Sequence, residues 1–553
     1  MAGAPERLPR PGPADPYLAA VASGLVVFDG ATGTNLQLRA LSADDFGGAD
    51  LEGCNEALVL HRPDVVESLH RSFLDVGVDA VETDTFGAFS VVLAEYGLQA
   101  RAREIGERAG AIARRVADEY AGPTSPRFVA GSLGPGTRFP TLGQISYDDL
   151  AASYEELAVG LLDGGVDLLL IETVYDLLSA KAAIVASRRA MARAGRVVPI
   201  QLQVTIELTG RMLPGTEIGA ALTALAPLDI DVIGLNCATG PVEMYEPLRQ
   251  LSESAPMPLA CMPNAGLPSV VDGLMHYDLT PEALAEHLAR FVSENGVSVV
   301  GGCCGTTPEH LARVVADVKP LTPAPRDAHL EPAAASIYSA TPYRQDRSVL
   351  LVGERTNANG SKRFREAMLS GDWDTCVAIG RDQIREGAHV LDVCVDYTGA
   401  DGVADMDELM SRLCTQSSVP IMVDTTEAPV ARRALTWLGG KALLNSVNLE
   451  EGDGPGTRLD AFLSLAKEFG AGVVATCIDE VGQARDAEWK IRAARAITDL
   501  AVGRYGLSPS DIFIDPLALP ISTGMEESRR DGLETLNALR RLREEVPGVR
   551  SIL

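Results

Sequence analysis

The sequence predicts an α/β protein built from two (β/α)8 barrels in tandem, with the second barrel truncated after about six strands. Short apolar, β-branched runs alternate with longer amphipathic stretches from residue 25 to about residue 320. A stretch rich in Pro and Ala then interrupts the series, and a second alternation of the same kind begins near residue 348. Continuous apolar runs are typical of parallel strands that are buried on both faces. Their alternation with helical patterns indicates repeated βαβ units.

The first series contains eight apolar runs. They are residues 25–31, 80–86, 128–134, 168–174, 199–206, 232–238, 258–264 and 297–304. The stretches between them, such as residues 62–76 and 147–164, carry apolar residues at helical spacing. Eight strand–helix units over about 280 residues predict a closed barrel. An open doubly wound sheet is the alternative, but eight strands favour closure.

The second series contains six apolar runs and then the start of a seventh. The six are residues 348–355, 389–396, 420–426, 442–449, 472–479 and 511–517, and residues 550–553 resemble the opening of the next strand. Six strands and a fraction leave edges unpaired. We therefore expect a piece of a longer chain that lacks the last two βα units, with a natural open sheet as the alternative.

The expected domain boundaries follow from these two series. Residues 1–20 are expected to form a disordered lead-in, because they are rich in Pro, Gly and Ala and lack the apolar core of a signal peptide. Residues 21–320 form the first barrel, and residues 347–553 form the incomplete second one. Residues 321–346 have the composition of a semi-rigid linker.

Length, charge and hydropathy restrict the class of protein. A chain of 553 residues exceeds a single core, and 46% hydrophobic with 22% charged residues is ordinary for a globular protein. The net charge of −28 argues against nucleic acid as a partner, because phosphate binding needs a basic surface. No run of about 18 apolar residues predicts a membrane span. A cytoplasmic protein is expected.

Three cysteines stand out among the nine in the chain. The run 297–300 ends in Gly301-Gly302-Cys303-Cys304-Gly305, and another strand end carries Cys237. A lone Cys is more often a buried apolar residue. Adjacent cysteines between glycines can instead point at one metal ion, and three thiolates with an open fourth position are typical of a catalytic zinc. A metal site in a reducing compartment is therefore expected rather than a disulfide framework.

Other polar residues fall at the same end of the first barrel. They are Asp29, Glu82, Asp84, Glu172 and Asn236. Each carboxylate alone could be a helix cap, but their convergence on the catalytic rim of a barrel favours a polar small-molecule pocket. Gly30 and Gly33 could let backbone amides approach a ligand carboxylate, and Glu172 could receive an ammonium group.

Three segments together resemble the homocysteine-binding domain of the zinc-dependent homocysteine S-methyltransferases. They are Asp29-Gly30-Ala31-Thr32-Gly33-Thr34, Gly234-Leu235-Asn236-Cys237 and residues 301–305. The resemblance covers residues 20–320 and implies that Cys237, Cys303 and Cys304 bind zinc, with the homocysteine sulfur as fourth ligand. The homocysteine-binding residues that it implies are Asp29, Gly30, Ala31, Thr32, Glu172 and Asn236. Asp84 stands where this family usually has Asn.

Carboxylates and amides also line the strand ends of the second series. They are Glu354, Asn357, Asp392, Asp424, Asn445, Asp479 and Asp515. Such an array can hydrogen-bond the donor and acceptor edge of an amide-rich heterocycle. Together with Asn445-Ser446-Val447 and Asp515-Pro516, these residues resemble the pterin-binding domain of the methyltetrahydrofolate methyltransferases.

The second resemblance carries its own implications. It implies that Glu354, Asp424, Asn445 and Asp515 hold the pterin, with Asp424 and Asn445 in the catalytic group and Asn357 and Asp392 as further binding residues. Cys394 stands where the family usually has Asn, and Asp424-Thr425-Thr426 replaces the more usual Asp-Ser-Ser.

The order of the two domains resembles the N-terminal half of the cobalamin-dependent methionine synthases. This implies that a methyl group moves from methyltetrahydrofolate to cobalamin and then to homocysteine, with cobalamin held by a domain outside this sequence. Asp327-Ala328-His329 only partly matches the short cobalamin signature and is interpreted as loop. One alternative is a cobalamin-free homocysteine S-methyltransferase that uses a sulfonium or betaine donor. The other is a non-catalytic protein that binds homocysteine or folate.

Overall fold

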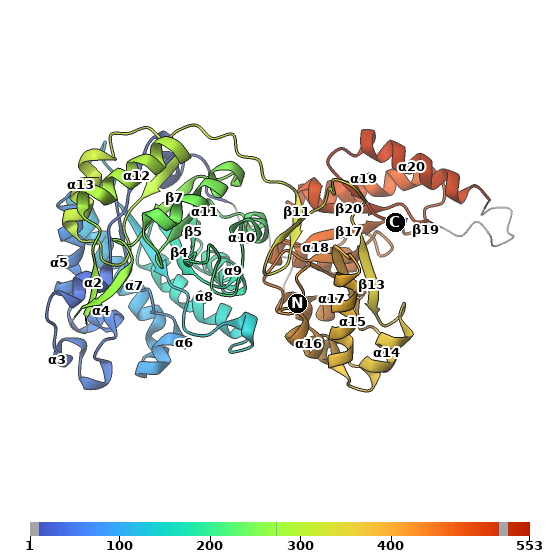
Figure 1. The fold of residues 1–553 in the computed structure, drawn as a ribbon, viewed down its shortest axis with the longest axis horizontal. Coiled ribbons are helices and arrows are strands. Elements are labelled where there is room, and N and C mark those ends of the chain that lie inside the picture. Colours follow the sequence, from blue (N-terminus) through green and yellow to red (C-terminus); the bar gives the residue numbers. More distant parts are fainter. Residues whose placement is uncertain (1–9, 272–273, 519–528) are drawn as a thin grey trace. The chain divides into compact units, whose positions relative to one another are not determined.

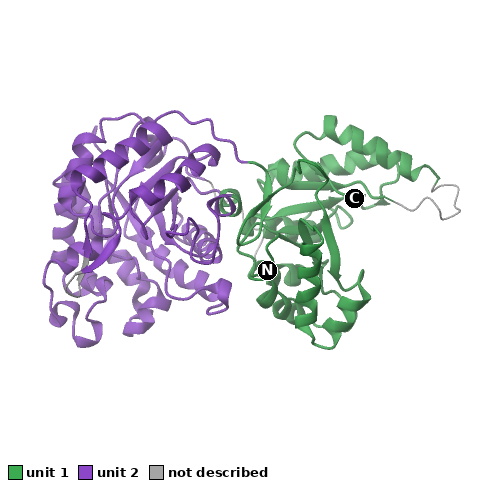
Figure 2. Cartoon of the chain, viewed as in Figure 1, with its two compact units in different colours: residues 1–7, 223–228, 331–553 green, residues 8–222, 229–330 purple. Residues whose placement is uncertain are grey.

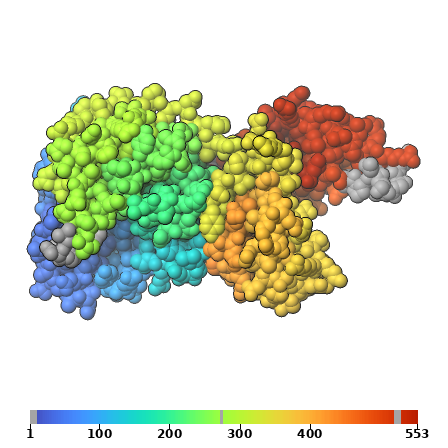
Figure 3. Space-filling model, in the orientation of Figure 1, coloured from blue at the N-terminus to red at the C-terminus, as the bar shows by residue number. Residues whose placement is uncertain are grey.

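The computed structural model describes residues 10–271, 274–518 and 529–553. The chain divides into two compact units, one of residues 8–222 and 229–330 and the other of residues 223–228 and 331–553 (Figure 2). Each unit contains one large parallel sheet with helices packed around it (Figure 1). Figure 3 shows the same orientation with the atoms drawn as spheres and coloured along the sequence.

The first unit is a closed barrel of eight parallel strands, as the sequence predicts. Their order around the sheet is β1 (Val26–Val27), β10 (Val297–Val300), β7 (Leu259–Met262), β6 (Val232–Asn236), β5 (Ile200–Val204), β4 (Leu168–Val174), β3 (Phe128–Leu133) and β2 (Ala80–Glu82). A parallel bridge between Phe28 and Ala80 joins the two ends of this order. The alternative of an open sheet is therefore wrong.

Helices cover the outside of this barrel. The long ones are α5 (Pro63–Leu74), α7 (Ala102–Tyr120), α8 (Tyr147–Asp163), α9 (Leu177–Ala194), α10 (Ile218–Leu225), α11 (Pro241–Ser254), α12 (Pro281–Asn295) and α13 (Pro308–Asp317). Side chains of Ser146, Asp176 and Thr280 cap the N-termini of α8, α9 and α12, which satisfies amides that a helix start leaves free. The hairpin of β8 (Pro268–Val271) and β9 (Leu274–Tyr277) follows β7.

The strand starts of the first barrel share one hydrogen-bonding pattern. Asp79, Asp167 and Asp231 each precede a strand, and each accepts a backbone N–H from the neighbouring strand, at 3.0, 2.7 and 2.9 Å. The donors are Val27, Val129 and Ile200. At the start of each strand, a carboxylate takes the place of a backbone carbonyl as the acceptor. These residues therefore satisfy buried amides and fix the register of adjacent strands.

The N-terminal segment differs from its expected disorder. Helix α1 (Pro16–Ser23) is capped by Asp15 and buries Tyr17 and Val21 in the core at the base of the first barrel, against Phe28 and Phe128. The Tyr17 hydroxyl donates to Gln201 Oε1. A lead-in over residues 1–20 is therefore wrong from Pro16 onward, and residues 1–9 lie outside the described residues.

The second unit has seven parallel strands in chain order. They are β13 (Val352–Asn357), β14 (Val390–Cys394), β15 (Ile421–Asp424), β16 (Leu443–Val447), β17 (Gly472–Thr476), β20 (Ile512–Asp515) and β21 (Arg550–Ser551). Strands β13 and β21 are the two edges, and no pairing joins them within the described ranges. Six strands and the start of a seventh are confirmed.

Among the described residues, seven longer helices accompany these strands. They are α14 (Lys362–Leu369), α15 (Trp373–Arg385), α16 (Gly402–Leu413), α17 (Ala428–Leu435), α18 (Arg458–Phe469), α19 (Ala487–Gly503) and α20 (Asp531–Glu545). A small hairpin of β18 (Ile478–Asp479) and β19 (Gly482–Gln483) separates β17 from α19. Throughout the part of the chain that is described, no helix combines the length and apolarity needed to cross a bilayer.

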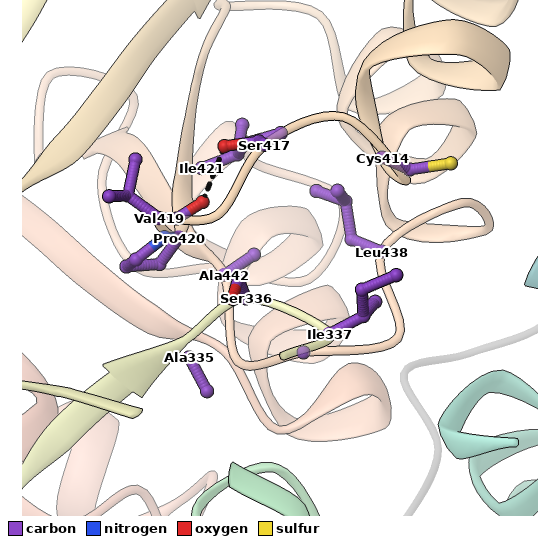
Figure 4. Close-up of a pocket in the computed structure, with 11 residues that line it drawn as sticks. Ala335, Ser336, Ile337, Cys414, Ser417, Val419, Pro420, Ile421, Leu438 and Ala442 are labelled. Atoms are coloured by element: carbon purple, nitrogen blue, oxygen red, sulfur yellow. Dashed lines mark hydrogen bonds between the residues drawn. The ribbon is translucent and has the colours of Figure 1, made fainter. Parts of the chain in front are cut away.

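The segment expected as a linker contains a hairpin of β11 (Ala333–Ala335), which is buried, and β12 (Ala340–Pro342), which is half-buried. Ala334 and Tyr343 join the core of the second unit, and Tyr343 donates to Asp511 Oδ1, which also pairs with Lys441 at 2.6 Å. A linker over residues 321–346 is therefore wrong for residues 333–343. A small, largely apolar pocket beside this hairpin lies at the start of β15 and β16, away from the strand ends that carry the polar residues (Figure 4).

Candidate functional site

Three thiols meet at the carboxyl ends of the first barrel's strands. Cys237 follows β6 directly, and Cys303 and Cys304 follow β10. Their sulfur atoms all lie within 4.8 Å of one another, and the Sγ atoms of Cys237 and Cys304 are 3.8 Å apart. The structure thus brings together the three cysteines that the sequence singled out.

The backbone around these cysteines is held in an uncommon conformation. Cys237 lies in the left-handed region at a φ of 58°, and Gly305 does so at 81°. A Cβ at Gly305 would overlap the ring of Tyr277, and one at Gly302 would overlap Thr306. The Cys303 amide donates to the Pro263 carbonyl at 2.9 Å. The glycines are therefore required for close packing, and the turn aims both sulfurs at one point.

The three thiols form one electrostatic group. Hydrogen bonds from Cys237 and Cys303 lower the pKa of Cys304 to about 3. The same contacts, together with burial, raise the pKa of Cys303. The Tyr277 hydroxyl also lies within hydrogen-bonding distance of Cys304. A cluster of soft donors that stabilises a thiolate has the ligand chemistry that zinc takes with one position open.

Carboxylates from neighbouring strands lie inside the same barrel. Glu172 accepts the Ser132 hydroxyl at 2.6 Å and the Asn236 amide at 3.1 Å. Burial raises its pKa to about 7, with a further contribution from the charge of Cys304. Asp29 accepts the Glu82 amide at 3.0 Å through Oδ2, while its buried Oδ1 has no partner among the described residues. Burial likewise raises the pKa of Asp29. An acceptor left unpaired in this position suits a donor supplied by a ligand.

The first glycine of the Asp29–Thr34 segment packs closely against the turn that carries the cysteines. A Cβ at Gly30 would overlap the Thr306 side chain, and the Ala31 amide donates to Thr306 Oγ1 at 3.2 Å. Gly30 therefore permits packing between this segment and the cysteine turn. Thr32 begins the short helix α2 (Thr32–Gln37). A Cβ at Gly33 would meet only the amide nitrogen of Asn55.

Asp84 is buried close to the end of β2. Its side chain is 3% exposed, and its Oδ2 has no partner within the described ranges. Burial, and then the charge of Glu56, raise its pKa well above the ordinary value. This environment favours the neutral acid, which can donate a hydrogen bond as the amide of an Asn would.

Three further residues around this site, Ser132, Tyr277 and Thr306, were not predicted from the sequence. Ser132 lies within the apolar run of β3, and its partner is Glu172. Tyr277 comes from the hairpin after β7 and Thr306 from the turn after Cys304. A polar residue inside an otherwise apolar strand was the only available signal, and it pointed to Ser132 alone.

The second barrel brings several of its predicted residues together. Asn357 Nδ2 donates to Asp392 Oδ2 at 2.9 Å and to Asp424 Oδ2 at 2.8 Å. Burial, and then the charge of Asp424, raise the pKa of Asp392 to about 7. Asn445 is the register partner of Asp424 on the adjacent strand. Glu354 is exposed, and its negative charge raises the pKa of both Asp392 and Asp424.

The remaining candidates of the second barrel have local partners. Asp515 Oδ1 accepts the Leu517 amide at 2.8 Å. Buried Cys394 accepts a hydrogen bond from Asn359 Nδ2 at 3.6 Å. Asp479 lies on the β18–β19 hairpin rather than on β17, and it accepts the indole N–H of Trp489 at 2.6 Å. A single strand over residues 472–479 is therefore wrong, because the chain turns after Thr476.

We expect Asp392→Asn to change the pH dependence of the second unit's stability. The folded-state pKa of Asp392, about 7, exceeds the unfolded value of about 3.9. Its contribution to stability is therefore complete below pH 4 and is lost as the pH rises through 7. Asn keeps the acceptor for Asn357 but cannot ionise. Between pH 5 and pH 8, the unfolding free energy of the variant relative to that of wild type should rise by about 2 kcal/mol. Thermal melts at the two pH values measure this change. Parallel pH profiles would contradict this prediction.

Comparison with known proteins identifies the class to which this arrangement belongs. The sequence model of the family described as "Homocysteine S-methyltransferase" matches residues 26–318, and that of "Pterin binding enzyme" matches residues 353–551. The chain belongs to the homocysteine S-methyltransferase family, and its second barrel matches the pterin-binding family.

Two curated relatives match almost the whole chain. This chain is 53% identical over 529 residues to a methionine synthase of Mycobacterium tuberculosis. It is 50% identical over 541 residues to a methionine synthase of Mycobacterium leprae. These matches cover 96% and 97% of this chain but 44% and 45% of the two relatives. The chain thus spans less than half the length of the relatives that it matches.

Solved structures match parts of the chain at low identity. The oxidized homocysteine methyltransferase MmuM from Escherichia coli is 22% identical, with a TM-score of 0.45, over 54% of this chain and 98% of that one. A dihydropteroate synthase from Xanthomonas albilineans is 23% identical, with a TM-score of 0.28, over 37% and 72%. The family assignment rests on the sequence matches.

Proposed function

We propose that this chain carries the homocysteine and folate sites of a methionine synthase. A methyl group would move from 5-methyltetrahydrofolate to cobalamin and then to homocysteine, giving tetrahydrofolate and methionine. The observation that carries the proposal is the convergence of Cys237, Cys303 and Cys304 at the rim of a homocysteine S-methyltransferase barrel. A pterin-binding barrel in the same chain supplies the site for the donor.

The three thiolates would hold one zinc ion. Zinc bound there would supply Lewis-acid chemistry that keeps the homocysteine sulfur as a thiolate at neutral pH, where a free thiol of pKa about 8.5 is mostly protonated. The chain itself supplies three anionic donors and a rigid turn. Because these donors are electron-rich, the homocysteine sulfur would remain nucleophilic toward the methyl group.

The carboxylates of the first barrel would bind the amino-acid part of homocysteine. Asp29 Oδ1 is a buried acceptor without a partner in the described part of the chain, and Glu172 is fixed by Ser132 and Asn236. An ammonium group would satisfy these acceptors and offset the mutual repulsion of the acids. The expected result is a substrate held by its charged end, with its sulfur at the cysteine cluster.

The second barrel would orient the pterin ring of methyltetrahydrofolate. Asp392, Asp424, Asn445 and Asp515 offer carboxylates and an amide at neighbouring strand ends, and Asn357 holds two of the aspartates in place. Cobalamin would be bound by a domain outside this sequence. A cytoplasmic location would suit the nine free cysteines, because that compartment keeps thiols reduced.

Methionine formation from free methylcobalamin and homocysteine tests the proposal. The zinc-loaded chain should produce methionine from this pair and bind methyltetrahydrofolate. Methionine formed only with a sulfonium or betaine donor would favour a cobalamin-free homocysteine S-methyltransferase. Binding of homocysteine without methionine from any donor would indicate a non-catalytic binding protein.

A further inference from the structure

A buried lysine lies behind the candidate folate site, and none of the described carboxylates forms an ion pair with it. Lys490 is on α19 and is 1% exposed. Its Nζ donates to the carbonyls of Ala484 at 2.8 Å, of Leu517 at 3.3 Å and of Pro516. A buried ammonium is costly unless its donors are used, and here backbone carbonyls use them.

Two of these carbonyls belong to the turn that follows β20. Leu517 lies in the left-handed region at a φ of 62°, which is uncommon for a residue with a branched side chain. Its carbonyl also accepts the Thr535 hydroxyl at 2.9 Å, and its amide donates to Asp515 Oδ1 at 2.8 Å. An unfavourable backbone conformation of this kind persists only where its surroundings fix it.

The turn determines how Asp515 is presented. Asp515 is the last residue of β20, at the strand end where the pterin would lie. The Leu517 amide donates to one oxygen of the Asp515 carboxylate, which restricts the directions that the side chain can take. The positive charge of Lys490 also acts on this carboxylate. Lys490 can therefore control both the direction and the charge of Asp515 without touching a ligand.

We propose that Lys490 is a positioning residue for the folate site, because it holds the left-handed turn at Leu517 and so orients the Asp515 carboxylate toward the pterin. This inference rests on the proposed folate function of the second barrel. It assigns to α19 a role that reaches the ligand only through the backbone at residues 516–517.

The chain contains a matched control for this role. Lys441 is also buried, at 5% exposure, but it pairs with Asp511 at 2.6 Å and lies near Tyr343 at the opposite ends of the strands. Lys441→Met and Lys490→Met both remove a buried ammonium. Both variants are expected to be less stable than wild type, so a general loss of stability cannot distinguish them.

Hydrogen exchange tests the structural step without any ligand. In Lys490→Met, the Leu517 amide should exchange at least about tenfold faster than in wild type, because its turn is no longer held. In Lys441→Met, the exchange rate of the Leu517 amide, taken relative to the other amides of the second unit, should equal that of wild type. An unchanged Leu517 amide in Lys490→Met would overturn the proposal.

A double-mutant cycle tests whether Lys490 acts through Asp515. Lys490→Met should weaken methyltetrahydrofolate binding by about tenfold in the wild-type background but less than about twofold in an Asp515→Asn background. Equal factors in both backgrounds would overturn the positioning role. If the wild-type chain failed to bind methyltetrahydrofolate, the folate part of the proposed function would fall, while the exchange measurement would still decide whether Lys490 holds the turn.

Discussion

The Cys303→Ala variant is expected to lose stoichiometric zinc and homocysteine methylation together, while methyltetrahydrofolate binding is unchanged. Two thiolates leave two positions of the metal to water, and the homocysteine thiol would no longer complete a four-sulfur set. Zinc affinity should fall by about 100-fold or more, since even outer partners of a metal ligand contribute 10- to 100-fold. Metal content after dialysis, and methionine formed from methylcobalamin, measure the two losses.

Cys261→Ala is the matched control for this experiment. Cys261 is a buried cysteine of β7 in the same barrel, and its sulfur lies 3.9 Å from that of Met244, outside the cluster of three. Its loss should cost stability but leave zinc and activity at wild-type levels. Stoichiometric zinc retained in Cys303→Ala would contradict the assignment of the three ligands.

The Tyr17→Ala variant is expected to destabilise the first barrel by about 3–5 kcal/mol, as large aromatic-to-Ala changes in a core do. The Tyr17 ring makes edge contacts with Phe128 and Phe28, at centroid distances of 5.4 and 6.3 Å. The ring is buried in the core at the base of the barrel, so its removal leaves a cavity there. Thermal or urea unfolding of the first unit measures the loss.

Tyr17→Phe separates packing from hydrogen bonding at this position. It keeps the ring and removes only the donor to Gln201, so a loss of about 1 kcal/mol is expected. Tyr17→Ala that unfolds like the wild-type chain would mean that α1 does not contribute to the core.

The architecture was predictable from the sequence because its signal is local. Each buried parallel strand is a short apolar run, and each outer helix repeats apolar residues at its own period. In a barrel, all the strand ends lie on one rim. Cys237 and the Cys303-Cys304 pair could therefore be placed together although more than sixty residues separate them, and their sulfurs do meet.

The segments that were missed depend on tertiary contacts. Helix α1 is short and follows a run of Pro, Gly and Ala, which predicted disorder. It is anchored by one aromatic residue, Tyr17, whose burial could not be predicted from its neighbours in the sequence. Four of the six strand residues of the β11–β12 hairpin are Ala, and the hairpin lies in a Pro-rich stretch. The burial of β11 therefore depends on the sheet that it covers. The partners of Lys490 are backbone carbonyls, which every residue has, so the amino-acid sequence does not indicate them.

Zinc-edge X-ray absorption of the purified chain, with and without homocysteine, tests the central claim most directly. We expect three sulfur ligands at about 2.3 Å and one lighter ligand in the free protein, changing to four sulfurs when homocysteine is added. Fewer than three sulfurs in the free protein, or a sulfur count that homocysteine does not change, would contradict a zinc site that activates the homocysteine thiol.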